Sequence, residues 1–205
     1  MNSKPILIKK PQQQRSKQKV EAIYAALTRI LQQQSFARIT TAEIALEAEL
    51  SIGSLYDYFG NKESILIGYI DRQLSLSLQQ IQQQAEQAQL SANIALQALL
   101  RGGIQFALQE QAAIRALCFT MPQYLSEIDL HRSKAKIEQI SVTFAKAHRL
   151  HIPKAQQAAL MFSLSNIVLG YQFRLAILED CPFSEAQLVA QLEAIIAPLL
   201  FSAAP

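Results

Sequence analysis

Residues 40–63, TTAEIALEAELSIGSLYDYFGNKE, constrain the fold more strongly than any other part of the chain. Thr40 and Glu43 have the spacing of a capping box, in which a hydroxyl and a carboxylate each satisfy an unpaired backbone N–H at a helix start. Ser51 is suited to cap a second helix, and Asn61 a third. The segment therefore predicts two short helices joined by a tight turn and followed by a third helix, a pattern typical of a helix-turn-helix.

The second short helix is expected to bury one side and expose the other. Leu55 and Phe59 lie four residues apart and therefore point inward together. Gly60 suits the left-handed residue that ends such a helix. A helix with small exposed side chains can lie deep in the major groove of DNA, because its backbone approaches the base edges without steric conflict. The residues expected on the exposed side are Gly53, Ser54, Asp57 and Tyr58.

This segment resembles the N-terminal pattern of the TetR/AcrR family of transcriptional regulators. The resemblance is specific over about residues 15–72 and is one of architecture alone beyond them. It implies an all-α fold, with an N-terminal three-helix helix-turn-helix DNA-binding domain and a C-terminal helical ligand-binding and dimerisation domain. The matching residues, in order and without a gap, are Thr40-Thr41, Ile44-Ala45, Ala48, Ser51-Ile52-Gly53-Ser54-Leu55-Tyr56, Tyr58-Phe59 and Lys62-Glu63.

One position departs from the family pattern. Glu49 stands in the turn, where the family usually has glycine. A residue other than glycine must tolerate whatever strained backbone the turn requires, at a cost of about 1 kcal/mol.

The resemblance carries DNA contacts over to matching positions, with double-stranded DNA containing a palindromic operator as the partner. Thr41, Tyr56 and Lys62 are expected to hold phosphates through hydroxyl donors, positive charge and helix dipoles. On this basis a Lys62→Ala variant would weaken binding to all DNA sequences similarly, and the slope of log K against log salt concentration would become shallower by about 0.9. Tyr58 has two alternatives, a DNA contact or a packed aromatic. The residues expected to meet bases are Ile52, Gly53, Ser54, Asp57 and Tyr58.

The charge distribution supports a DNA-binding N-terminal part. Residues 1–72 contain ten basic and seven acidic residues, whereas the remainder has nine of each, so the net charge of +3 lies in the first part. No acidic residue precedes Glu21, which concentrates the positive field on a basic arm at 1–14 and on the first helix. We expect a DNA-binding domain at 1–72 and an effector-binding and dimerisation domain at 73–205.

Apolar residues recur at helical spacing through the rest of the chain, without alternating β patterns. Residues 160–178 are apolar nearly all round, so this helix needs cover on both sides. Together with the final helix it predicts a homodimer surface, and the family's interface is formed by its last two helices; the alternative is a central core helix. The expected helices cover residues 15–34, 62–89, 91–109, 111–120, 130–148, 153–178 and 184–200.

The resemblance also implies an effector pocket among the C-terminal helices. The candidate lining is mostly apolar, so a small, apolar, uncharged effector is expected, oriented by Asn166, Tyr124 or Gln105. In the family mechanism the effector favours a spacing of the two helix-turn-helix units that misfits the operator. The candidate lining residues are Leu99, Gly103, Phe106, Cys118, Met121, Tyr124, Ile140, Phe144, Phe162, Asn166 and Phe173.

The sequence gives little support for an enzyme, a cofactor or a metal site. Cys118 and Cys181 lack the close pairing of a metal site, and His148 with His151 suits a helix end better than a zinc site. The pair Gly102-Gly103 lacks the lysine and strand of a phosphate loop, so it is interpreted as close helix packing or as a local kink beside a cavity. No apolar run follows the N-terminal lysines, and polar residues interrupt the most apolar helix. A cytoplasmic protein without a membrane contact is expected.

The resulting hypothesis is a ligand-responsive repressor that a small apolar effector releases from its operator. One alternative is a DNA-binding protein of the same fold that has no small-molecule effector and is controlled by a protein partner or serves an architectural role. Another is a helical ligand carrier or enzyme.

Overall fold

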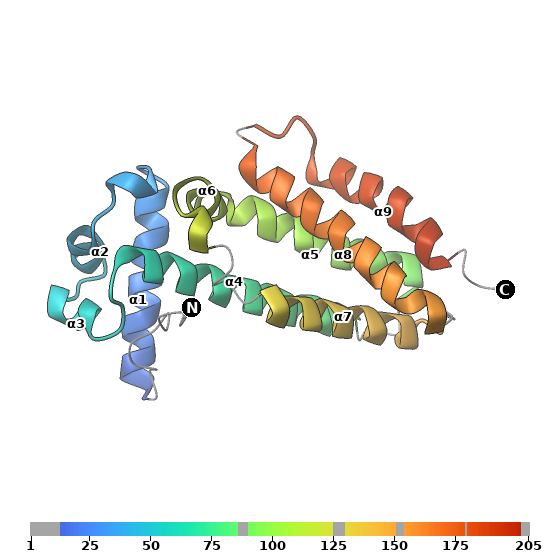
Figure 1. Ribbon diagram of the computed structural model, residues 1–205, viewed down its shortest axis with the longest axis horizontal. Coiled ribbons are helices and arrows are strands. Elements are labelled where there is room, and N and C mark those ends of the chain that lie inside the picture. Colours follow the sequence, from blue (N-terminus) through green and yellow to red (C-terminus); the bar gives the residue numbers. More distant parts are fainter. Residues whose placement is uncertain (1–12, 86–89, 125–129, 151–153, 179, 202–205) are drawn as a thin grey trace. The chain divides into compact units, whose positions relative to one another are not determined.

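The computed structural model describes residues 13–85, 90–124, 130–150, 154–178 and 180–201 of the 205-residue chain (Figure 1). These residues form helices and connections without a β-strand, which confirms the all-α fold class. The helices are α1 (Gln14–Leu31), η1 (Phe36–Arg38), α2 (Thr41–Glu47), α3 (Ile52–Tyr56), α4 (Lys62–Ala85), α5 (Ala92–Gln109), α6 (Gln111–Thr120), η2 (Pro122–Tyr124), α7 (Leu130–Ala147), α8 (Lys154–Ile177) and α9 (Glu185–Phe201).

The chain divides into two compact units. The first comprises Met1–Gln73 and Ala112–Asp129, and the second comprises Leu74–Gln111 and Leu130–Pro205. The predicted basic arm at 1–14 lies almost entirely outside the described residues. Helix α4 begins in the first unit and ends in the second.

The first unit buries one apolar core contributed by α1, α2, α3, the first turns of α4, and α6. The stripe along α1 covers the inner side of the helix-turn-helix, as its apolar spacing predicts. Helix α6 adds three buried residues to this core and Met121 directly after it adds a fourth, which the sequence did not indicate. Fully buried side chains of α1 to α4 include Ile23, Leu27, Ile44, Leu55, Ile65 and Leu66, and the buried residues that α6 and its end contribute are Ala113, Ala116, Leu117 and Met121.

The local signals of the helix-turn-helix are confirmed. The Thr40 hydroxyl accepts from the Glu43 N–H at 3.2 Å, and the Glu43 carboxylate accepts from the Thr40 N–H at 2.7 Å, which completes the capping box. The Ser51 hydroxyl caps α3 by accepting from the N–H of the third helical residue at 3.1 Å. The Asn61 side chain caps α4, since its Oδ1 accepts from Ser64 N–H at 2.7 Å.

Two backbone predictions in this region had different outcomes. Glu49 has φ 56°, so the turn does place a non-glycine residue in the left-handed region. The prediction for Gly60 was wrong, because no glycine among the described residues has a positive φ. The chain leaves α3 at Tyr56, and Asp57 remains right-handed, so a left-handed stop is not needed.

In the second unit α5 packs against both α8 and α9. A Cβ at Gly103 of α5 would collide with the Gln172 side chain of α8, and one at Gly102 would lie 3.0 Å from Ile81 Cγ1 of α4. The two glycines therefore allow close helix packing, as predicted. Buried residues of this core include Leu96, Leu100, Ile104, Ile140, Phe144, Leu164, Leu188, Leu192 and Ile196.

Candidate nucleic-acid interface and effector cavity

The hydroxyls of two predicted phosphate contacts lie together. Thr41 is the first residue of α2 and Tyr56 the last of α3, and their hydroxyl oxygens are 3.0 Å apart and hydrogen-bonded. Tyr56 is exposed. The pair therefore presents two hydroxyl groups beside the first N–H groups of α2, an arrangement suited to a phosphate oxygen.

The exposed side of α3 is small and largely uncovered. Ile52 at its first position is 42% exposed. A Cβ added at Gly53 would have no other atom within 4 Å, so the backbone there is open to an approaching surface. Ser51 donates to the Ser54 hydroxyl at 3.0 Å, and Asp57 remains exposed. Four of the predicted base contacts therefore share an accessible surface.

Tyr58 does not belong to this surface. Its side chain is 7% exposed and lies in the core of the first unit, so its expected outward position was wrong. The expectation assumed that α3 continues through Phe59, but the helix ends at Tyr56. Of the two alternatives for Tyr58, the structure favours the packed aromatic.

Lys62 points back into the protein. Its Nζ donates to the carbonyl oxygens of Phe36, Ala37 and Ile39 at 3.0, 3.1 and 2.8 Å, and it lies 4.9 Å from the centre of the Phe36 ring. An ammonium group has three N–H donors, and these three carbonyls use them all. In this conformation Lys62 has no donor left for a phosphate.

Two arginines that the sequence reasoning missed tie α1 to its neighbours. Arg29 donates to the Glu47 carboxylate of α2 at 2.5 Å and to the Glu47 carbonyl at 3.1 Å. Arg72 of α4 makes a two-fold contact with the Glu21 carboxylate, at 2.7 and 2.5 Å. Both ion pairs are exposed, so each adds about 1 kcal/mol or less. Their partners lie 18 and 51 residues away in the sequence, whereas helix periodicity relates only residues three or four positions apart, so the sequence does not predict these pairs.

The pKa values of two side chains of the first unit, Glu43 and Tyr24, are shifted by their surroundings. Hydrogen bonds from the Thr40 hydroxyl and backbone lower the pKa of Glu43, which keeps the capping carboxylate ionised. Burial raises the pKa of Tyr24, whose ring lies 5.6 Å from Phe59 and 6.0 Å from Tyr69 between ring centres. Tyr24 is therefore a neutral core residue.

The predicted effector-lining residues do not gather around one cavity in the described structure. Cys118 and Met121 belong to the first unit, and Met121 is part of its core. Ile140 and Phe144 are packed in the core of the second unit, where Gly103 faces Gln172 and Leu99 is partly buried. Helix α8 exposes three of the others, and the side chain of Tyr124 lies outside the described part. The exposed residues are Phe162, Asn166 and Phe173.

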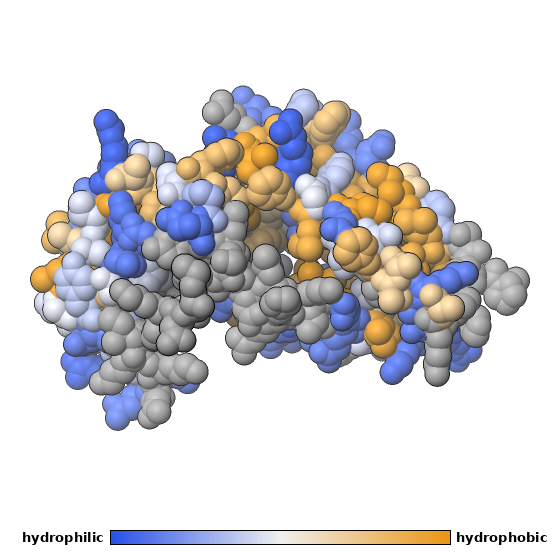
Figure 2. Space-filling view, in the orientation of Figure 1, coloured by the Kyte–Doolittle hydropathy of each residue, from blue (hydrophilic) through white to orange (hydrophobic). Residues whose placement is uncertain are grey.

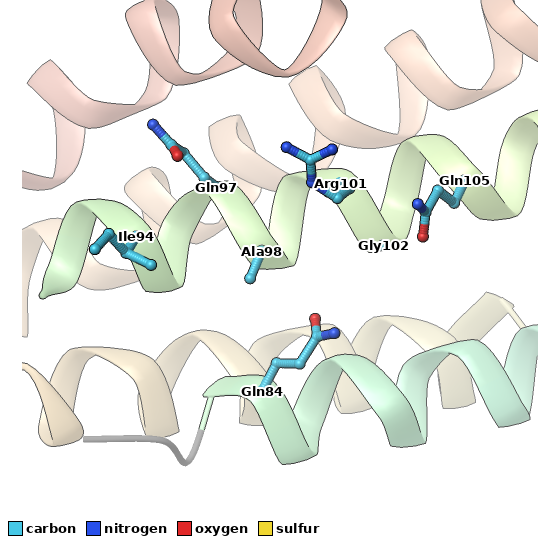
Figure 3. Close-up of a pocket in the computed structure, with 7 residues that line it drawn as sticks. All are labelled: Gln84, Ile94, Gln97, Ala98, Arg101, Gly102 and Gln105. Carbon is cyan, nitrogen blue, oxygen red and sulfur yellow. The ribbon is translucent and has the colours of Figure 1, made fainter. Parts of the chain in front are cut away.

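A cavity of about 230 Å³ lies between α4 and α5 of the second unit (Figure 3). Figure 3 shows Gln84 pointing from α4 towards α5, whereas Gln97 and Arg101 of α5 point away from α4. Arg101 and Gln105 contact the Glu185 carboxylate of α9 at 2.7 and 3.2 Å. The Gln84 Oε1 is buried without a hydrogen-bond partner. The lining consists of Gln84, Ile94, Gln97, Ala98, Arg101, Gly102 and Gln105, which is more polar than predicted.

The described residues contain no group of three or more His, Cys, Asp or Glu side chains placed to hold a metal ion. Cys118 is half-buried, and burial raises the pKa of its thiol, which makes it a weak nucleophile. His148 packs against Phe144 with 4.6 Å between ring centres and the ring planes tilted by 49°. His151 lies outside the described residues.

Helices α8 and α9 leave large apolar side chains uncovered on the single chain, and Figure 2 shows apolar atoms gathered over these helices. Ala155–Ile177 of α8 is long and apolar enough to cross a membrane, although a single such helix is weak evidence because core helices share these properties. The exposed apolar residues of this surface, named here the α8–α9 surface, are Phe162, Leu169, Phe173, Ile195 and Leu199.

Residues 23–68 match the family model of bacterial regulatory proteins of the tetR family. This range runs from the middle of α1 into α4, so it contains the whole helix-turn-helix. No curated protein sequence matches the chain significantly.

Solved structures of TetR-family regulators share the fold. A protein assigned to that family from Mesorhizobium loti MAFF303099 has a TM-score of 0.71 at 20% identity, over 92% of this chain and 98% of its own. A TetR-family transcriptional regulator from Streptomyces coelicolor has a TM-score of 0.69 at 17% identity, over 92% and 82%. The regulator FadR from Bacillus subtilis, in complex with stearoyl-CoA, has a TM-score of 0.62 at 16% identity, over 88% and 97%.

Proposed function

We propose that the chain is a TetR-family protein and that it is a homodimeric, ligand-responsive transcriptional repressor; the match of residues 23–68 to the family model and the shared fold support this. It acts in the cytoplasm on a palindromic operator. Residues 1–72 form the DNA-binding part, and residues 73–205 form the effector-binding and dimerisation part. The observation that supports DNA binding best is the open side of α3 beside the hydrogen-bonded hydroxyls of Thr41 and Tyr56.

The proposed DNA contacts come from the exposed side of α3 and from the neighbouring Thr41–Tyr56 pair. Thr41 and Tyr56 hold a phosphate, which fixes the register of the protein on the duplex without reading sequence. Ile52 and the open Gly53 lie against base edges, where an apolar side chain suits a thymine methyl group. Ser54 and Asp57 are the polar members of the set, and Asp57 is able to accept from a cytosine N4.

The α8–α9 surface supports a second copy of the chain as the partner. A two-fold dimer buries the same patch on both subunits and places two α3 helices for the two halves of a palindrome. A membrane is the less suitable cover, because Gln156, Gln157, Ser163 and Asn166 interrupt the apolar run.

The effector is proposed to enter the second unit at the cavity between α4 and α5. Ile94 and Ala98 offer apolar contact and the glutamine amides offer polar contact, so the effector has an apolar body with a polar group. The stearoyl-CoA held by the Bacillus subtilis FadR combines a long acyl chain with a polar part. Repression is relieved only when the effector binds the DNA-incompatible state more tightly than the DNA-binding state.

Selection of bound duplexes from a random DNA pool tests this function. The expected result is an imperfect palindrome whose half-sites lie about one helical turn or a multiple of it apart. If the folded protein retains no duplex at low salt, the DNA-binding function is wrong, and the carrier or enzyme alternative stands. A thermal-shift panel of apolar and acyl compounds then tests the effector, because a ligand that binds only the folded state raises the melting temperature.

A further inference from the structure

We propose that Lys62 is a positioning residue that locks the connection in front of α2 to the start of α4, and that it is not a phosphate ligand. The inference rests on the proposed DNA-binding function. It differs from the role that the resemblance implies, in which a lysine at this position holds a phosphate.

The contacts of Nζ carry the argument. Three carbonyl oxygens, those of Phe36, Ala37 and Ile39, converge on the ammonium at 3.0, 3.1 and 2.8 Å. Because Arg38 and Ile39 are also bonded to Ser35 and Phe36 by their N–H groups, this segment forms one turn of η1 with its carbonyls turned towards Lys62.

The segment matters because it leads directly into the proposed phosphate site. Only Thr40 separates Ile39 from Thr41, and Ile39 is 1% exposed. The lysine therefore fixes the N-terminus of α2 from one side, while the capping box fixes it from the chain itself. A phosphate that recruited Lys62 would have to break three charged hydrogen bonds, which are among the strongest in proteins, and of the three carbonyls Phe36 alone would keep a second donor among the described residues, the Ile39 N–H.

Two substitutions separate the positioning role from the phosphate role. Lys62→Met removes the donors and the charge, and Lys62→Arg keeps the charge in a planar group whose geometry does not match three converging carbonyls. If Lys62 is a phosphate ligand, Lys62→Arg should bind DNA as well as the wild type, because arginine binds phosphate well, and Lys62→Met should reduce the slope of log K against log salt concentration by about 0.9. If Lys62 is a positioning residue, neither arginine nor methionine restores its function, and this slope stays unchanged in both variants.

The first measurement is thermal unfolding in the absence of DNA. We expect Lys62→Met to lower the melting temperature by roughly 4 °C or more, whereas the control Lys146→Met, at an exposed lysine of α7, melts like the wild type. If Lys62→Met melts like the wild type, the positioning role is wrong. This outcome is independent of DNA, so it remains decisive even if the protein binds no duplex.

The second measurement is duplex affinity across a salt series, well below the melting temperature of each variant. We expect both Lys62 variants to bind roughly ten-fold more weakly at an unchanged salt slope. Val20→Ala, a truncation in the same core, is the matched control and is expected to lower the melting temperature without weakening binding. A reduced slope for Lys62→Met, or full binding by Lys62→Arg, overturns the proposal, as does an equal loss in Val20→Ala.

Discussion

At Gly53 the fold accepts a methyl group that a bound duplex would not. An added Cβ meets no atom within 4 Å, and alanine favours a helix over glycine by up to about 1 kcal/mol. Gly53→Ala is therefore expected to keep or raise the free energy of unfolding and to weaken operator binding about ten-fold. Urea unfolding and fluorescence anisotropy measure the two effects. Unchanged affinity would place Gly53 outside the interface.

The left-handed backbone at Glu49 gives a second prediction at the scale of one residue. Glycine adopts φ 56° without the Cβ penalty, so Glu49→Gly is expected to raise the free energy of unfolding by about 1 kcal/mol. Glu49→Gln removes the charge but keeps the Cβ, and it serves as the control with no gain. Equal stability of both variants in urea would show that the turn is not strained.

At the scale of elements, the capping box of α2 makes stability depend on pH. The folded-state pKa of Glu43 lies below its usual value because of the bonds to Thr40, so its contribution is present above the unfolded pKa and is lost as pH falls through the folded one. The loss of stability in Glu43→Ala is therefore expected to be largest near neutral pH and to shrink in acid. Unfolding curves of both proteins between pH 7 and about pH 3 measure the difference. A gap that stays constant with pH would contradict this assignment.

The same elements explain which features the sequence predicted. The caps at Thr40, Ser51 and Asn61 depend on spacings of three residues, and all of them form. The misplacement of Tyr58 came from an error of a few residues in the end of α3, after which helical periodicity no longer fixes a side chain's direction.

Contacts between distant segments were beyond sequence reasoning. The three carbonyls that Lys62 binds lie 23 to 26 residues before it. The effector residues were selected for apolar character, but the same character suits a core, as at Ile140, and an exposed helix face, as at Phe162. Only the packing of the helices decides between these environments.

At the scale of the whole molecule, the α8–α9 surface predicts the oligomeric state. Phe173→Glu places a charge on an apolar surface that a second copy would bury, so a monomer is expected at micromolar concentration, with weaker operator binding. Phe119→Glu is the matched control, since Phe119 of α6 is 63% exposed but lies outside the surface. Sedimentation velocity measures both variants. If Phe173→Glu remains a dimer, the interface lies elsewhere.

The uncovered apolar side chains of α8 and α9 also affect how a cell would use the protein. If the proposed homodimer forms, two chains must meet before either is fully protected from water, and newly made copies would be prone to misassociation and proteolysis until a mate is found. In a cell with few copies, occupancy of paired half-sites would grow with the square of their number, so a small change in synthesis would switch the target more sharply than a single-chain binder allows.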